Sequence, residues 1–194
     1  MPRIEPRDLL DFEEYKSRHQ QIRAEVIKAR DLRRVEVGPW VSFTFENRAT
    51  VLYQIQEMIR VEHLTDPAKV REEIEAYEEL LPTADELSAT MFIEISDAVQ
   101  RDRALSSLGG VEKTISLKIG GTAIPARDKR PIDPRFERPG RASAVYYLGF
   151  NLPARAKPDL VKGADVRLDI SHPRYGHSAA IPADSCAALA ADLG

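Results

Sequence analysis

Apolar residues recur every three or four positions through much of the first half of the chain, which is the spacing of a buried helix face. This periodicity predicts helices over about residues 6–30, 48–64 and 67–80. Pro6 suits the first turn of the first helix, because the N–H at that position has no partner within a helix. Asp66 suits the position that caps the third helix. The first helix is long enough that it must pack on another surface, and we expect that surface to be the body of the same chain.

Alternating apolar and polar residues, the period of a strand, dominate the second half of the chain. A Gly-Pro turn inside residues 35–46 predicts the first hairpin, in which Val41, Phe43 and Phe45 share one face. Further strands are predicted over about 88–96, 114–121, 142–152, 164–171 and 178–182, and short helices over about 97–108, 153–162 and 183–192. Strands that follow a helical half favour an α+β fold. We expect a mostly antiparallel sheet packed against a helical N-terminal half with a long first helix.

The length of 194 residues fits a single domain, with a helical arm over 1–34 and an α+β body over 35–194. Hydrophobic residues make up 43% of the chain and charged residues 30%, an ordinary balance for a soluble protein. No apolar run approaches the roughly 20 residues of a membrane helix, and the N-terminal residues lack the apolar run of a signal peptide. We therefore expect a cytoplasmic protein with no membrane partner. Cys186 is the only cysteine, which excludes an internal disulfide and a Cys-rich metal site.

Two segments depart from the average charge. Residues 66–86 carry eight acids and two bases, whereas residues 127–141 carry six bases, three acids and three prolines. The basic segment has no predicted element, so it is either a solvated or disordered loop or a loop that binds a partner or an anion. The net charge of −3 argues against a general nucleic-acid-binding protein, and the one aromatic residue of the basic segment is thin support for base stacking.

The predicted helix over 48–64 carries a polar cluster beside its apolar face. Glu57 and Arg60 are i, i+3 neighbours, and Gln56 lies next to them. In a functional interpretation Glu57 is a base or a metal ligand that Arg60 orients; otherwise the two form a surface pair that contributes about 0.2–0.5 kcal/mol. Glu46 and Arg48 lie at the junction between the preceding strand and this helix, and they are further catalytic candidates.

Glu94 is the fifth catalytic candidate, because it is predicted to lie in the middle of a strand between two isoleucines. If its face of the sheet is covered, the buried carboxylate requires an arginine partner, and without one its pKa rises. Buried carboxylates of that kind occur in functional sites and in structural ion pairs alike. An exposed sheet face is the alternative.

His172 and His177 are five residues apart around a Pro-Arg-Tyr-Gly turn. Two imidazoles together with Glu57, Glu62 or Glu94 could bind iron or zinc, since both metals accept histidine and carboxylate ligands. The chain has no short metal-binding motif of the HExxH type, however, and His172 also suits a hydrogen-bonded turn position. The metal candidates are therefore Glu57, His172 and His177.

Four stretches carry a resemblance to a known family: Phe45-Glu46-Asn47-Arg48, Gln54-Ile55-Gln56-Glu57-Met58, Glu86-Leu87-Ser88-Ala89-Thr90 and His172-Pro173-x-Tyr175. The chain resembles an uncharacterised bacterial family, a domain of unknown function of about this length. Genes of that family tend to lie near those of rubrerythrin-like iron proteins and iron–sulfur oxidoreductases. The resemblance implies an accessory role in redox or oxidative-stress metabolism, and it implies no catalytic residues.

These observations support two hypotheses of different kinds. The first is a non-catalytic accessory protein that binds a redox protein through the basic segment 127–141 or the acidic segment 66–86. The alternative is a metal-dependent enzyme, using iron or zinc, in which Glu46, Glu57, Arg60 and His172 gather in one pocket. Nucleic-acid binding through the basic segment ranks below both, and the sequence leaves the formation of a homo-oligomer open.

Overall fold

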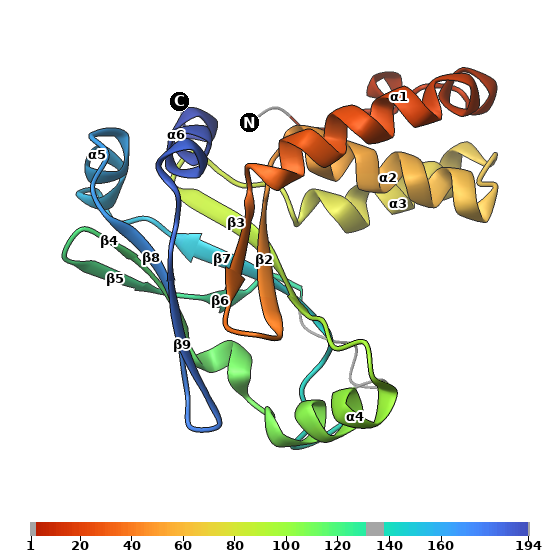
Figure 1. Ribbon diagram of the computed structural model, residues 1–194. Helices are drawn as coiled ribbons and strands as arrows, with labels where there is room; N and C mark the ends of the chain where they lie inside the picture. The colour runs from red at the N-terminus through yellow and green to blue at the C-terminus, as the bar shows by residue number, and fades with distance from the viewer. Residues whose placement is uncertain (1–2, 131–137, 194) are drawn as a thin grey trace.

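The computed structural model describes residues 3–130 and 138–193, which form two antiparallel β-sheets and six α-helices (Figure 1). Sheet A has the strand order β1-β2-β3-β7-β6, and sheet B has the order β5-β4-β8-β9. The strands are β1 (Arg34–Val37), β2 (Val41–Glu46), β3 (Glu86–Ile93), β4 (Ile115–Ile119), β5 (Thr122–Pro125), β6 (Arg127–Asp128), β7 (Val145–Asn151), β8 (Val166–His172) and β9 (Tyr175–Ala180). The helices are α1 (Phe12–Asp31), α2 (Arg48–Glu62), α3 (Pro67–Glu78), α4 (Ala98–Ser107), α5 (Ala156–Val161) and α6 (Ala183–Asp192), with 3-10 turns η1 (Pro6–Asp8) and η2 (Val111–Thr114). The predicted α+β class and the long first helix are confirmed.

Two hydrophobic clusters hold these elements together. The larger joins sheet A to sheet B and includes Phe43, Phe45 and Phe150, each at most 1% exposed. The smaller lies among α2, α3 and the N-terminal segment and is built around Val51 and Ile55. Each fully buried side chain of this size contributes about 1.5–3 kcal/mol. The helices α1, α2 and α3 therefore form a separate layer at one end of sheet A (Figure 1).

The first helix begins later than predicted. Pro6 starts the short η1 turn, and α1 begins after Asp11, whose side chain accepts a hydrogen bond from the N–H of Glu14. A capping aspartate satisfies an N–H that the helix itself leaves unpaired, so it fixes the start of α1 there. The helix then lies along α2, where the Tyr15 hydroxyl donates to Glu57 Oε1 at 2.8 Å, and just before the helix Gln56 binds both the N–H and the carbonyl of Leu10 at 3.0 and 3.1 Å. The predicted packing of this helix on the same chain is thus observed.

Helix α2 has defined ends. Asn47 and Thr50 form a reciprocal capping box at its start, in which each side chain accepts the other residue's N–H at 3.0 Å. His63 ends the helix in the left-handed region, with φ of 51°. The predicted cap of α3 is also present, because the side chain of Asp66 accepts the N–H of Ala68 at 2.9 Å.

Three predictions in the second half were wrong in detail. The strand predicted over 114–121 is present as β4 but ends at Ile119, because Gly120 turns the chain at φ of 54° and residues 122–125 return as β5, which was not predicted. Strand β3 ends at Ile93, so Glu94 follows the strand and does not lie in its middle. The basic segment is not entirely a loop: Arg127 and Asp128 pair with β7 as β6, while residues 131–137 lie outside the described residues. No helix in the described ranges is long and apolar enough to cross a membrane.

Candidate functional site

Glu57 lies at the contact between α2 and α1, where three side chains converge on its carboxylate. Its Oε1 accepts hydrogen bonds from the Tyr15 hydroxyl at 2.8 Å and from Arg60 Nε at 2.9 Å. The same oxygen lies 3.0 Å from His19 Nε2. Arg60 also donates to Oε2 at 3.2 Å, which completes a two-pronged contact. Glu57 and Arg60 thus form the i, i+3 pair that their spacing predicts.

The electrostatics of this cluster favour a structural role for Glu57 over the role of a catalytic base. Burial raises the pKa of Glu57, but the hydrogen bonds from Arg60 and Tyr15 outweigh it and hold the pKa below the usual value. Burial, followed by the hydrogen bond to Glu57, raises the pKa of Tyr15. Near neutral pH the carboxylate is therefore charged and the phenol neutral. Because neighbouring groups already bind both carboxylate oxygens, the cluster holds α1 on α2 and offers little basicity to a substrate.

Glu46 is a buried carboxylate at the end of β2, with 2% of its surface exposed. It accepts hydrogen bonds from Thr50 Oγ1 at 2.5 Å, Thr90 Oγ1 at 2.6 Å and Gln54 Nε2 at 3.1 Å. All three donors are neutral, and among the described residues no cation pairs with Glu46. Arg48, the other catalytic candidate at this junction, binds Asp8 at 2.7 Å. Glu46 therefore ties β2, β3 and the start of α2 together.

Glu94 has the arginine partner that a covered carboxylate requires, although its side chain is 51% exposed. It pairs with Arg34 at 2.5 Å and accepts a hydrogen bond from Ser42 Oγ at 2.6 Å. Burial raises its pKa, but the contacts to Ser42 and Arg34 lower it further than burial raises it. Glu94 is thus a structural link from the end of β3 to β1 and β2.

The two candidate histidines lie in the β8–β9 hairpin. The neighbouring Tyr175 makes the contacts that join this hairpin to the turn between β1 and β2. Its hydroxyl donates to the carbonyl of Val37 at 2.8 Å and accepts the N–H groups of Trp40 and Val41 at 3.0 and 3.1 Å. The ring of His177 lies edge-on to that of Tyr175 at 4.4 Å. Sequence reasoning named Tyr175 only as part of the His172-Pro173-x-Tyr175 motif and missed its contacts, because its partners are more than a hundred residues away along the chain.

Glycine at position 38 makes this contact possible. A side chain there would place its Cβ 2.6 Å from the Tyr175 hydroxyl and from the His177 ring, and the residue also has φ of +74°. His172 accepts the N–H of Arg174 at 3.3 Å, as expected for a hydrogen-bonded turn residue. The Gly-Pro-Trp turn and the His-Pro-Arg-Tyr turn are therefore two halves of one structural contact between the sheets.

The predicted site residues do not converge on one pocket. Three separate places hold them (Figure 1). Glu46 ends β2, and Arg48, Glu57 and Arg60 follow along α2; Glu94 lies just after β3; His172 and His177 lie in the β8–β9 hairpin. Within residues 3–130 and 138–193, no three His, Cys, Asp or Glu side chains are grouped closely enough to hold a metal ion. The expected group of Glu57, His172 and His177 is thus not assembled.

The acidic and basic segments instead meet each other. Lys129 and Arg127 both pair with the carboxylate of Glu86, whose side chain is 3% exposed, and Lys129 Nζ also donates to the carbonyl of Leu81 at 2.8 Å. Lys129 is itself only 5% exposed, and burial lowers its pKa against the opposing effect of Glu86. Gly149 makes room for this pair, since a Cβ there would lie 2.9 Å from Glu86 Oε2.

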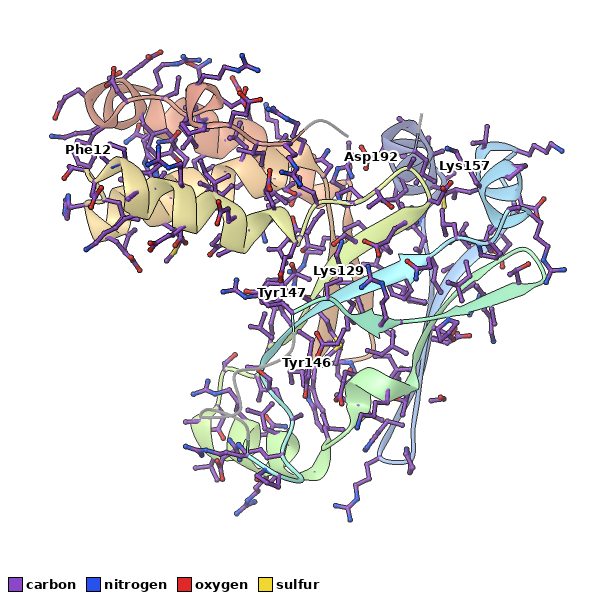
Figure 2. All side chains as sticks on the ribbon, turned by 180° about the vertical axis from the view of Figure 1, so that it is seen from behind. Phe12, Lys129, Tyr146, Tyr147, Lys157 and Asp192 are labelled. Atoms are coloured by element: carbon purple, nitrogen blue, oxygen red, sulfur yellow. The ribbon has the colours of Figure 1, made fainter. Side chains whose placement is uncertain are left out.

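Beyond Glu86, the basic segment continues toward α3. Figure 2 shows Lys129 beside Tyr147 at the edge of sheet A, below the helical layer. The guanidinium of Arg130 lies 5.9 Å from the ring of Tyr147 and 6.0 Å from that of Tyr77 on α3, both within the range of cation–π contacts. Arg127 and Lys129 are two positions apart, so they share one face of a strand. This spacing is the sequence signal that could have predicted their common contact with Glu86.

The outer side of α3 carries exposed acids, which follow the exposed bases Lys69 and Arg71 near the start of the helix. Val70, Ile74 and Tyr77 turn toward the smaller hydrophobic cluster, while Glu72, Glu75 and Glu79 are exposed on the outer side; we call these three the α3 acidic face. None of the three forms an ion pair with another described residue. Nearby, burial and the charge of Glu62 raise the pKa of Glu73. Negative charge is therefore crowded on this helix.

Comparisons with known proteins agree on the fold and give no activity. Residues 3–193 match the model of a family described as "Protein of unknown function (DUF3501)". The chain is also similar to a crystal structure at 1.90 Å of a novel protein of unknown function from Burkholderia pseudomallei K96243, with a TM-score of 0.91 and 32% sequence identity over 100% of both chains. No curated protein matches the chain.

Proposed function

Because the chain belongs to the family of proteins of unknown function DUF3501, we propose a role from its own surface: a non-catalytic accessory protein that binds a redox protein through the α3 acidic face. The family match agrees with the resemblance to an uncharacterised family drawn from the sequence. The link to redox metabolism rests on that resemblance, which places related genes near those of rubrerythrin-like and iron–sulfur proteins.

The observation that carries the proposal is the position of the acids on α3. A helix C-terminus favours cations, yet the last turn of α3 contains no base and ends in Glu75, Glu78 and Glu79. Each such charge costs about 0.3–1 kcal/mol, and the like-charged i, i+4 pair Glu75–Glu79 costs about 0.2–0.5 kcal/mol more. An arrangement that lowers the stability of the free protein is expected where a partner supplies the missing cations.

The structure favours this face over the basic segment as the docking surface. Arg127 and Lys129 already neutralise Glu86 within the chain, so their charges are used internally. Glu78 on the inner side of α3 is also engaged, since it accepts the N–H of Ile4 at 3.2 Å. Complementary charge across an interface mainly accelerates association and selects the partner. The redox partner is therefore expected to present lysine or arginine side chains to α3.

A metal-dependent enzyme remains the alternative, but no comparable observation favours it. Its candidate ligands lie in separate parts of the fold, and the carboxylate of Glu57 is engaged by Tyr15 and Arg60. Elemental analysis of untagged protein purified from the native bacterium tests this alternative directly. Stoichiometric iron, zinc or manganese would restore it.

The proposal is tested by purification of the tagged protein from the native bacterium at low and at high salt. We expect an iron-containing partner to be retained at low salt and lost at high salt. The variant Glu72→Gln/Glu75→Gln/Glu79→Gln should lose it at both. The control Glu13→Gln/Glu25→Gln/Asp31→Asn removes the same charge from exposed positions of α1 and should retain it.

A second measurement keeps the test independent of capture from a lysate. The purified rubrerythrin-like protein of the same bacterium is titrated with the wild type and both variants. Weaker binding of the α3 variant alone, with a steep dependence on salt, supports the proposal. Equal binding of the two variants, or no partner at either salt, contradicts it.

A further inference from the structure

A cavity lies away from the α3 acidic face, at the other end of sheet A. It has a volume of about 600 Å³ and lies among α4, η2, β6 and the segment that leads into β7. Side chains of both charges line it, together with the hydroxyl-bearing Ser143 and Tyr146. Figure 2 shows Tyr146 on the part of β7 nearest to α4 and η2. Volumes of about 300–1,000 Å³ are typical of sites for small molecules.

The wall of the cavity on the α4 side is held in place by several contacts. Arg141 pairs with Asp102 at 2.9 Å and donates to the hydroxyl of Ser106 at 2.7 Å. A Cβ at Gly109 would lie 2.4 Å from the carbonyl oxygen of Gly140, so the two backbone segments meet directly at these glycines. The wall is therefore formed before any ligand arrives, which lowers the cost of binding.

Two carboxylates line this cavity: Glu112, which has a buried oxygen, and Asp128, which is exposed to solvent. The Oε2 atom of Glu112 is buried and has no hydrogen-bond partner within residues 3–130 and 138–193. Asp128 accepts the N–H of Arg130 at 3.1 Å, and among the described residues it has no ion-pair partner. Burial and the charge of Glu112 raise the pKa of Asp128. A buried acceptor without a donor costs about 1–3 kcal/mol, and more when it is charged, so this end of the cavity favours a ligand with N–H groups.

Tyr146 adds a hydroxyl to the same end. Its oxygen accepts the N–H of Ser143 at 2.8 Å, and its own proton faces the carboxylate of Glu112. Burial raises the pKa of Tyr146 to about 12; the N–H of Ser143 opposes this shift, and the charge and hydrogen bond of Glu112 add to it. The phenol therefore stays protonated near neutral pH. Lys113 and Arg138 line the cavity as well and bring positive charge to it.

We infer that this cavity binds a small zwitterion of the amino-acid class. The ammonium group of the ligand binds between Glu112 and Asp128, and its carboxylate faces Lys113. The paired opposite charges on the wall match the paired opposite charges of such a molecule. A simple anion would meet two carboxylates, and a simple cation would meet the lysine, so each would bind more weakly than the zwitterion.

The inference is tested with the intact protein and the standard amino acids, added one at a time, by thermal shift and then by calorimetry. For an amino acid that binds, the matched amine without the carboxylate and the matched acid without the amine are measured as well. We expect the zwitterion to bind at least about ten-fold more tightly than either, as the loss of a charge-assisted hydrogen bond predicts.

Variants then locate the site. Glu112→Gln with Asp128→Asn should weaken binding by about ten-fold or more, because both charge-assisted contacts to the ammonium group are lost. Glu25→Gln with Asp31→Asn on α1, matched in charge, should leave it unchanged. If the cavity variant is unstable, Lys113→Met replaces it, and its loss should fall on the zwitterion and the acid but spare the amine. Failure of every amino acid to bind, or an unchanged affinity in the cavity variants, overturns the inference.

Discussion

Removal of Lys129 should destabilise the protein far more than removal of an ordinary surface lysine. Lys129→Met keeps most of the side-chain volume but leaves Glu86 buried, with only the half-exposed Arg127 as a partner, and it takes a donor from the carbonyl of Leu81. Breaking one side of a buried ion pair costs about 3–5 kcal/mol. Because Arg127 still reaches Glu86, we expect a loss near the lower end, about 3 kcal/mol.

A loss of this size is readily measured. Folded domains have a total stability of about 5–15 kcal/mol, and for a chain of this length each kcal/mol lowers the melting temperature by about 2–4 °C. Urea unfolding followed by circular dichroism and by the fluorescence of Trp40 gives the free energy directly. Lys129→Met should therefore melt about 6–12 °C below the wild type.

The double variant Glu86→Leu/Lys129→Met provides the decisive comparison. It removes both buried charges, so its stability should return to within about 1–2 kcal/mol of the wild type, since an apolar pair can replace a buried ion pair at little cost. A loss below about 1 kcal/mol in Lys129→Met, or a double variant as unstable as the sum of the two single variants, would refute this account of the edge of sheet A.

Three further predictions concern other contacts. Tyr175→Phe removes the hydroxyl that binds Val37, Trp40 and Val41, and it should lower the free energy of unfolding by about 2–3 kcal/mol, measured in urea; no loss would show that water replaces the hydroxyl. Glu75→Gln should raise stability by a few tenths of a kcal/mol up to about 1 kcal/mol, because it removes an acid from the C-terminal end of α3, and a lower melting temperature would contradict this. The folded pKa of Glu57 lies below its unfolded value, so its stabilising contribution is present above about pH 4.5 and is lost as the pH falls through the folded pKa. Glu57→Gln should therefore be less stable than the wild type at pH 7, and the difference, measured by urea unfolding at several pH values, should shrink on acidification; a constant difference would exclude this origin.

Local patterns in the sequence predicted the helices well, because their signals lie within a few residues. The apolar period of α2, the cap at Asp66 and the bounds of α6 needed no knowledge of the rest of the chain. The sequence did not show that α1 begins after Asp11 and that Pro6 starts a separate 3-10 turn. Both residues suit the start of a helix, and which of them begins α1 depends on how residues 6–10 pack. The turn at Gly120 was missed because apolar residues continue on both sides of it.

The functional surfaces were harder to predict, since they depend on contacts between distant segments. The spacing of Glu57 and Arg60 predicted their pairing, but the Tyr15 hydroxyl that completes the cluster comes from another helix. The two charged segments were correctly recognised as unusual. That they neutralise each other through Glu86 and Lys129 requires the strand order of sheet A, which places β6 beside β7 and β7 beside β3. The period of a helix or strand predicts which face of the element a residue lies on, but it does not predict which distant residue that side chain contacts.

The shortness of β6 also bears on how the protein behaves at high concentration. An open sheet edge is a template on which a second chain can add a strand, and natural proteins guard such edges with very short strands and with lysine. β6 pairs through only Arg127 and Asp128, and Lys129 follows at once with its charge held by Glu86. An incoming strand would find few backbone groups to pair with there. We therefore expect the contact between Lys129 and Glu86 to protect the chain from edge-to-edge polymerisation.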